Sequence, residues 1–288
     1  SDANLTYALH ISGKILFNKE QNMTSHDVVN ALRRILHEKK IGHSGTLDPQ
    51  AQGVLLVLIG KACKVLPYLA DTDKEYVAQL QLGVRTLSDD CWGEILEQRE
   101  VVPIKDFSAL CREFVGEQEQ VPPIISSIKV NGKKLYEYAR AKEEIELPKR
   151  TVNIHEIEVL DEQNLSFRVA CSSGTYVRAL CRDMAQRSGN IGCMSSLIRT
   201  KVGRFSLTDC ATLEEVREGN FTLLTVDSIL DHIPVAHYEP IADIYNGKSV
   251  HMCPDGMPRR VRVQDNGVTI AIYDHSHQDV YKCARGIW

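Results

Sequence analysis

The feature that most limits how this chain can fold is an apolar run, VLLVLIG at residues 54–60. It follows directly on a polar, glycine-rich segment, IGHSGTLDPQAQG at 41–53. The apolar run is typical of a strand buried on both faces, and the three glycines and one proline before it predict a loop. The loop contains one carboxylate, Asp48. An Asp-Pro pair often begins an ordinary turn, but a loop beside a buried strand is also a typical place for catalytic side chains.

The other hydrophobic patterns mix strand and helix periodicity. The segment at 11–18 and the alternating patterns at 76–82 and 165–171 predict strands. Stripes with helical spacing lie at 28–36, after the cap candidates Thr24, Ser25 and Asp27, and at 107–114 and 177–184, which end near Gly116 and Gly189. Because strands and helices do not alternate strictly, the predicted class is α+β, with a mixed, mostly antiparallel central sheet and flanking helices.

The sequence pattern of the chain changes after about residue 232. Glycines and prolines there separate short alternating runs such as VRV at 261–263 and VTIAIY at 268–273. This pattern predicts a small all-β module. With 288 residues in all, we expect a large domain at 1–232 and a small one at 233–288.

Composition restricts the class of function. The net charge is −4, so a uniformly basic nucleic-acid coat is excluded and positive charge has to be local. None of the nine cysteines forms a CxxC pair, and the chain has no P-loop, GxGxxG or HExxH motif. His275 and His277, near Asp274 and Asp279, have metal-ligand chemistry, but a polar, solvated tail is the favoured interpretation. We therefore expect no metal or cofactor, reduced thiols in a cytoplasmic protein, and no membrane segment.

Several blocks of the sequence resemble one family in order along the chain, over roughly residues 11–230. They are GHSGTLDPQAQGVLLVLIGKACKVLPYL at 42–69, DTDKEYVAQLQLGVRTLSDD at 71–90, VPPIISSIKVNGKKLYEYAR at 121–140, SSGTYVRALCRDM at 172–184 and SLIRTKVGRF at 196–205. Together they resemble the TruB family of tRNA pseudouridine synthases of the bacterial type. The resemblance implies the pseudouridine synthase fold with a C-terminal PUA-like module, and isomerisation of uridine 55 in the T-loop of tRNA. It also implies a monomer without cofactor or obligate protein partner, whose C-terminal module binds the acceptor stem.

The resemblance assigns roles to the catalytic residues. Asp48 would be the single catalytic carboxylate, acting as nucleophile or as base, since an isomerisation that excludes water has no use for the second carboxylate of a glycosidase. Tyr76, by pattern alone a core aromatic, would stack on the flipped uracil, with Leu197 as the apolar floor beneath the base. Arg178 would pair with Asp48, and Asp90 would be its competing carboxylate.

The resemblance also assigns residues to RNA binding. His43 would fill the space that the extruded uridine leaves, and Lys19 would lie near the phosphates. A basic segment at about 125–150, with interleaved tyrosines, would be a flexible insertion that closes on the T-loop. Its candidate contacts are Lys129, Lys133, Lys134 and Arg140. In the C-terminal module the candidates are Lys248, Arg259, Arg260 and Arg262.

The match has departures and leaves alternatives open. Ile125 stands where the family usually has an aromatic residue, Ser127 replaces an alanine, and Leu87 replaces a polar residue. These differences bear on the packing of the insertion. A non-catalytic RNA-binding or tRNA-folding protein with the same fold is the main alternative. A synthase that depends on a guide RNA is the second, although its usual longer basic extensions are absent from this sequence.

Overall fold

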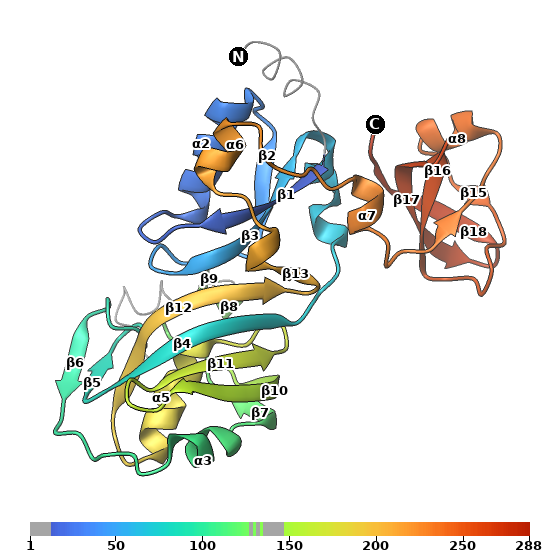
Figure 1. Ribbon diagram of the computed structural model, residues 1–288. Coiled ribbons are helices and arrows are strands. Elements are labelled where there is room, and N and C mark those ends of the chain that lie inside the picture. The colour runs from blue at the N-terminus through green and yellow to red at the C-terminus, as the bar shows by residue number, and fades with distance from the viewer. Residues whose placement is uncertain (1–12, 127–128, 131–132, 135–146) are drawn as a thin grey trace. The chain divides into compact units, whose positions relative to one another are not determined.

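The computed structural model describes residues 13–126, 129–130, 133–134 and 147–288 (Figure 1). The chain divides into two compact units, and both are discontinuous in sequence. Unit 1 comprises the described residues of Ser1–Pro49, Leu55–Asp71 and Thr208–Trp288. Unit 2 comprises the described residues of Gln50–Val54 and Thr72–Leu207.

Unit 2 is built on an antiparallel sheet. Its strands follow the order β12 (Gly192–Val202), β4 (Lys74–Leu82), β11 (Ser166–Cys171), β10 (Arg150–Asp161) and β7 (Gly116–Gln120). Each neighbouring pair is antiparallel, while the short pairing of β12 with β3 (Gln52–Ile59) is parallel. The predicted α+β class with a mostly antiparallel sheet is therefore confirmed.

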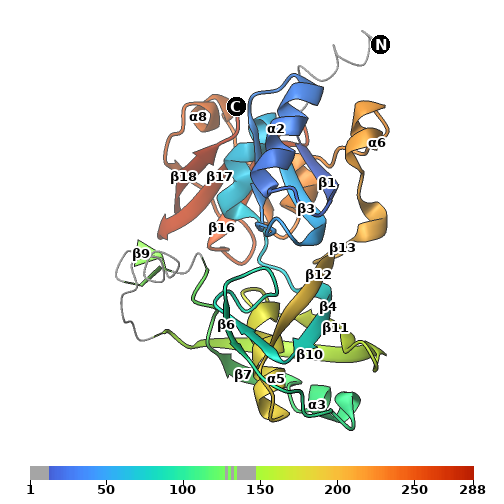
Figure 2. The ribbon, with the colours of Figure 1, turned by 90° about the vertical axis from the view of Figure 1, so that its left-hand side faces the viewer.

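Two helices cover one face of this sheet, as Figures 1 and 2 show from two directions. They are α5 (Val177–Arg187) and α3 (Phe107–Arg112), and their apolar stripes pack with the sheet around Phe107, Phe167 and Met184. Asp106 caps α3 by accepting a hydrogen bond from the backbone N–H of Ala109. The helix ends before Gly116, which instead begins β7 with a positive φ. The helix expected to reach Gly116 is thus shorter than its apolar stripe.

Unit 1 contains the N-terminal elements. Strand β1 (Gly13–Lys19) leads to α2 (Ser25–Leu36), where Thr24 and Asp27 form the expected capping box. The segment expected to be a loop from residue 41 begins instead with a strand, β2 (Ile41–Ser44), antiparallel to the end of β3. The loop is therefore confined to the residues between β2 and β3. Strand β3 is almost entirely buried, as its apolar run predicted, and continues into the 3₁₀ helix η1 (Gly60–Tyr68).

Shorter elements connect these parts. In unit 2 they are β5 (Val84–Thr86), β6 (Ile95–Gln98), β8 (Lys129–Val130), β9 (Lys133–Lys134) and β13 (Phe205–Ser206). The 3₁₀ helix η2 (Leu207–Asp209) follows, and α6 (Leu213–Arg217) and α7 (Val226–Ile229) belong to unit 1.

The C-terminal part of unit 1 forms a separate five-stranded sheet. Its order is β14 (Val235–Ala236), β16 (Arg260–Asp265), β17 (Val268–His277), β18 (Val280–Gly286) and β15 (Val250–His251). Tyr273 and Tyr281 are fully buried in its core. The expected β module is confirmed, with one added helical turn, α8 (Ile241–Tyr245). His275 and His277 lie on β17, which pairs with β18, so they are on a strand and not on the expected tail. His277 is exposed and His275 half-buried.

No helix in the described ranges is long and apolar enough to cross a lipid bilayer.

Candidate functional site

Asp48 lies exposed in the short loop between β2 and β3, whereas Leu47 before it is buried. Two groups fix the backbone on either side of Asp48. The Ser25 hydroxyl donates to the Leu47 carbonyl (3.2 Å) and accepts from the Leu47 N–H (3.1 Å), and the Pro49 carbonyl accepts from the Asn22 N–H (2.7 Å). The carboxylate is therefore presented to solvent from a backbone that is held on both sides.

Lys19 is the second support of this loop. It is fully buried, and its ammonium donates to the carbonyls of Met23 (2.6 Å), Glu20 (2.9 Å) and Pro49 (3.3 Å). A buried ammonium is tolerated only when its donors are satisfied in this way. The structure thus gives Lys19 a role that sequence reasoning missed, because lysines are mostly exposed. Its expected place near RNA phosphates remains a prediction.

His43 is half-buried on β2, opposite Val57 of β3. It belongs to the same hairpin as Asp48, and a rigid strand carries it. The role expected for it, filling the space of an extruded base, remains a prediction.

In unit 2, Tyr76 and Leu197 share one face of the sheet. Leu197 of β12 is paired with Ala78 of β4, and Tyr76 is two residues before Ala78 on β4, so the pleat directs both side chains to the same side. Both are half-buried and pack against the core cluster beneath α5. An aromatic ring and a leucine on one face could hold a flat, nearly neutral base.

Arg199 is a site residue that the sequence did not reveal. It is directly opposite Tyr76 in the β12–β4 pairing and is only 3% exposed. Its guanidinium donates from Nε (2.9 Å) and Nη2 (2.8 Å) to the carbonyl of Val54 and is hydrogen bonded to the Tyr76 side chain. Burial lowers the pKa of Arg199 from its usual value, an effect that Tyr76 opposes. An arginine remains charged after such a shift.

Gly53 allows this close approach. It has a φ of +117°, and a Cβ at this position would overlap with the backbone of Arg199, its partner in the parallel pairing of β3 with β12. Only glycine meets both conditions without strain. Gly53, the second residue of β3, is therefore needed for packing against Arg199.

Arg178 is the second residue of α5 and is 9% exposed. Its Nη1 donates to the carbonyls of Ser88 (2.8 Å) and Ile125 (2.9 Å). These contacts hold the guanidinium between two irregular segments, one of which leads into the expected insertion. Because Arg178 and Asp48 belong to different units, the pairing between them remains a prediction.

Asp90 and its neighbour have different partners. The Asp90 carboxylate accepts from the Ser88 hydroxyl (2.8 Å) and the Trp92 N–H (3.0 Å). Asp89 is buried and pairs with Nη1 of Arg182 (2.8 Å), and burial raises the pKa of Asp89 despite that partner. Arg182 also donates to a carbonyl of the 121–125 segment. Arg178 and Arg182, one turn apart on α5, thus fix the same two segments.

The basic segment is only partly described. Lys129 lies on β8, and Lys133 and Lys134 lie on β9, which pair as a short hairpin. Arg140 lies outside the described residues. The expected contacts of these four residues with RNA, and the closure of the segment on the T-loop, stay predictions.

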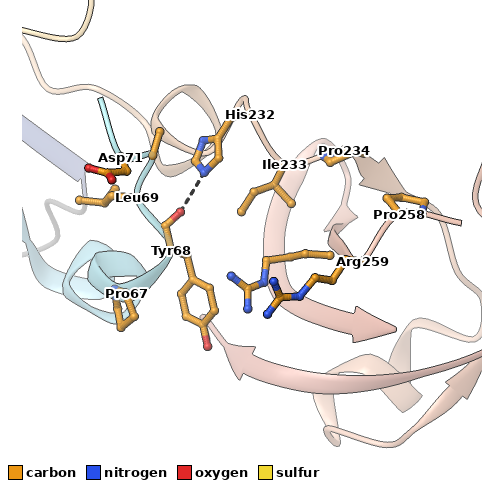
Figure 3. Close-up of a pocket in the computed structure, with 11 residues that line it drawn as sticks. Pro67, Tyr68, Leu69, Asp71, His232, Ile233, Pro234, Pro258 and Arg259 are labelled. Carbon is orange, nitrogen blue, oxygen red and sulfur yellow. Dashed lines mark hydrogen bonds between the residues drawn. The ribbon is translucent and has the colours of Figure 1, made fainter. Parts of the chain in front are cut away.

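A cavity of about 400 Å³ opens at the end of η1 within unit 1 (Figure 3). Tyr68, His232, Arg259 and Arg260 are among its lining residues, and none of the expected catalytic residues is. The Arg260 guanidinium stacks over the Tyr68 ring at 4.7 Å from its centroid. Each unit thus has its own candidate groups: unit 1 has the exposed Asp48, and unit 2 has a phenol, a leucine and buried cations. A carboxylate and a phenol are group types that acid–base or nucleophilic chemistry uses.

Comparison with known families gives a match over about half the chain. The family described as "TruB family pseudouridylate synthase (N terminal domain)" matches residues 33–177. A protein of Bacillus pumilus named tRNA pseudouridine synthase B is 44% identical over 240 residues, which is 78% of this chain and 78% of that protein. A protein of the same name from Bacillus cytotoxicus is 40% identical over 278 residues, which is 93% of this chain and 90% of that protein.

Solved structures share the fold. A crystal structure of a Cbf5-Nop10-Gar1 complex contains a chain similar to this one, with a TM-score of 0.70 at 24% identity over 96% of this chain and 85% of that chain. A structure of an H/ACA RNP bound to a substrate RNA containing 2′-deoxyuridine also contains a similar chain. Its TM-score is 0.69 at 22% identity, over 100% of this chain and 87% of that chain. At this identity the likeness establishes the fold alone.

Proposed function

The chain belongs to the TruB family of pseudouridylate synthases, and from that premise we propose that it isomerises uridine 55 in the T-loop of tRNA, with Asp48 as its catalytic carboxylate. That the chain is a tRNA pseudouridine synthase rests on relatives of that name across most of its length. The tRNA position and the role of Asp48 go further. The observation that carries the role of Asp48 is its exposure on a loop whose flanking carbonyls are held by Ser25 and Lys19, while position 55 is proposed from the family resemblance.

The reaction is an isomerisation without net exchange of atoms. The bond from uracil N1 to C1′ of the sugar breaks, the base turns, and a bond from C5 to C1′ forms. A proton leaves C5, and N1 gains one. The protein has to hold a detached, nearly neutral base and exclude water, tasks that suit the face of Tyr76 and Leu197.

Asp48 acts in this proposal as the nucleophile or as the base that starts elimination. Either role needs an ionised carboxylate. Closure of a site around the base removes water from the carboxylate and favours its neutral form. We propose that Arg178 offsets this effect by pairing with Asp48. The support is that Nη1 of Arg178 donates to the carbonyls of Ser88 and Ile125, which fix the guanidinium in position.

The remaining contacts are proposed from the resemblance. His43 fills the space of the extruded uridine, and Asp90 competes for Arg178. The basic segment at 125–150 closes on the T-loop, and the module at 233–288 contacts the acceptor stem. The protein acts as a cytoplasmic monomer without an obligate protein partner.

The alternative is a binding protein that shares the fold without catalysing the reaction. The combination of an exposed Asp48 with a phenol and a buried arginine on one face of unit 2 favours catalysis, since binding alone requires none of these groups.

The test is to incubate the purified protein with an unmodified tRNA transcript and no guide RNA, and to locate pseudouridine by chemical mapping. We expect modification at position 55 alone. Asp48→Asn should reduce the rate by more than about a hundredfold while tRNA affinity stays within about threefold. An unmodified transcript with tight binding would support the binding protein, and activity only with a guide RNA would support the guided synthase.

A further inference from the structure

We propose that Arg199 is a positioning residue of the reaction: its guanidinium fixes the Tyr76 phenol for proton transfer at the base and ties that phenol to the start of β3, next to the Asp48 loop. The inference rests on the proposed function and extends it to a residue that stood outside the expected site.

The first observation is the placement of the two side chains. Tyr76 and Arg199 face each other across the β4–β12 pairing, and a hydrogen bond joins their side chains. Across the other edge of β4, the residue opposite Tyr76 is the buried Val169. The acidic neighbour of Tyr76, Glu75, alternates to the other face, where Arg168 pairs with it. In the sheet, Tyr76 is therefore flanked by one cation and one apolar residue.

The second observation is the cost of this arrangement. A guanidinium that is 3% exposed has lost most of its hydration, and its burial lowers the pKa of Arg199. Such a group is kept only where its hydrogen bonds are well made. Nε and Nη2 of Arg199 both donate to the Val54 carbonyl, and these two bonds fix the plane of the guanidinium. The guanidinium therefore meets the Tyr76 side chain in one defined orientation.

The chemical consequence concerns the C5 proton. After the C5–C1′ bond forms, the proton on C5 has to leave to a base, and the Tyr76 oxygen lies on the face proposed to hold the uracil. Tyr76 accepts this proton as the phenolate, whose own proton has gone to solvent before the base is bound, and the proton that N1 gains comes from solvent. A guanidinium next to the phenolate oxygen stabilises its negative charge and fixes its direction. Arg199 thus increases the share of Tyr76 that is ionised and orients its oxygen, without touching the base.

The test is a double-mutant cycle with Arg199→Met, Arg199→Lys and Tyr76→Phe, measured under single-turnover conditions with excess protein. Arg199→Met should slow isomerisation by about ten- to a hundredfold, with RNA affinity changed by less than about threefold. The rate of Arg199→Lys should lie between those of the wild type and Arg199→Met, because an ammonium keeps the charge but not the planar geometry of the guanidinium. In the Tyr76→Phe background, the same Arg199 substitutions should cost less than about threefold.

The matched control is Lys201→Met. Lys201 is on the same strand, is half-exposed, and interacts with Glu75 on the other face of the sheet, so its loss should leave the rate unchanged. Thermal unfolding of each variant identifies any that fail to fold. As a second measurement, the rise of the rate with pH should move to higher pH in Arg199→Met, since the phenolate loses its stabilising charge.

The outcomes separate the two proposals. An inactive wild-type protein would overturn the proposed function itself. The positioning role would be overturned if the wild type is active, the rate losses from the Arg199 and Tyr76 substitutions multiply as independent effects, and the pH profile of Arg199→Met is unshifted. Arg199 would then only hold the strand through its hydrogen bonds to Val54.

Discussion

The buried cations that we propose to serve catalysis and the cations of the C-terminal sheet are held by different kinds of acceptor. In the first, Lys19, Arg178 and Arg199 donate to backbone carbonyls of loops and strand ends. In the second, Arg260 forms a two-point pair with Asp274, Arg262 pairs with Asp227, and Lys248 lies 3.3 Å from Asp243.

This difference separates two uses of positive charge. A carbonyl fixes a cation without neutralising it, so the cation can orient a loop and still attract a carboxylate or phosphate. An aspartate neutralises its partner and stabilises the sheet, which leaves less positive potential for RNA. Among the four basic residues expected to contact the acceptor stem, Arg259 is the one without an ion pair in the described part of the chain. Substitutions in the two regions should therefore have different effects.

The largest effect is expected for Arg178→Lys. An ammonium cannot bind the carbonyls of Ser88 and Ile125 in the same plane and also pair with a carboxylate, so turnover should fall by at least about a hundredfold. Single-turnover kinetics measure this. The control is Arg187→Lys, at the exposed end of the same helix and 3.8 Å from Glu113, which should keep full activity. Equal activity of Arg178→Lys and Arg187→Lys would mean that Arg178 does not serve catalysis through its guanidinium.

A smaller effect is expected for Lys19→Met. Methionine fills much of the space but leaves three carbonyls, among them that of Pro49, without their donor. Hydrogen bonds to a charged group contribute about 1.5–3 kcal/mol each, so both thermal stability and the aim of Asp48 should suffer. We expect turnover to fall by about tenfold while RNA affinity is kept. A variant that loses affinity and keeps its single-turnover rate would instead assign Lys19 to phosphate binding.

For the C-terminal sheet, Asp227→Asn should reduce stability and not turnover. Asp227 accepts hydrogen bonds from Thr269, Gln264 and Arg262, and an amide would place a donor against these donors. The expected loss is about 2 kcal/mol at pH 7, measured by urea unfolding, with unchanged activity at 25 °C.

The same variant gives a pH test. Burial by itself would raise the pKa of Asp227, but the hydrogen bonds from Thr269 and Gln264 and the charge of Arg262 outweigh it, so the pKa lies below its usual value. The contribution of a carboxylate with a lowered folded pKa is present above its unfolded pKa of about 4 and is lost as the pH falls. The stability difference between wild type and Asp227→Asn should therefore narrow below about pH 4. A constant difference would mean that the ionised form is not what stabilises the sheet.

The smallest effect is expected for Arg259→Ala. One lost phosphate contact should weaken tRNA binding by about two- to threefold and reduce the slope of log affinity against log salt by about one. Arg260→Ala, at the paired neighbour, should reduce stability more than it reduces the salt slope. If the salt slopes of Arg259→Ala and Arg260→Ala change equally, a cation that is paired with an aspartate still binds RNA in this module.

Local patterns predicted most of the elements because they depend on near neighbours in sequence. The α2 cap, the buried β3 run and the α5 stripe are of this kind. Strand β2 was missed because IGHS has no alternating apolar pattern, and only its pairing with β3 makes it a strand. The length of α3 was overestimated because apolar spacing continues past the last helical turn.

The site was predicted to different degrees for a similar reason. A resemblance to known blocks is sufficient to select Asp48, Tyr76 and Arg178. The burial of Lys19 and Arg199 depends on carbonyls 30 and 145 residues away in the chain, which no local pattern encodes. Gly53 carried a signal that could have been followed, since a glycine between a loop and a buried strand often marks a close backbone approach.

The division of the chain around Asp48 has a consequence for how such a protein can be divided or recombined. The chain leaves unit 1 after Pro49, contributes Gln50–Val54 to unit 2, and returns at Leu55. A single cut therefore cannot release either unit as one continuous piece without breaking the segment that follows Asp48. Gene fragments exchanged between relatives would have to carry both units together. The sheet that begins at Val235 occupies one uninterrupted stretch, but its exchange would have to preserve the contacts of the sheet with Asp227 and with η1.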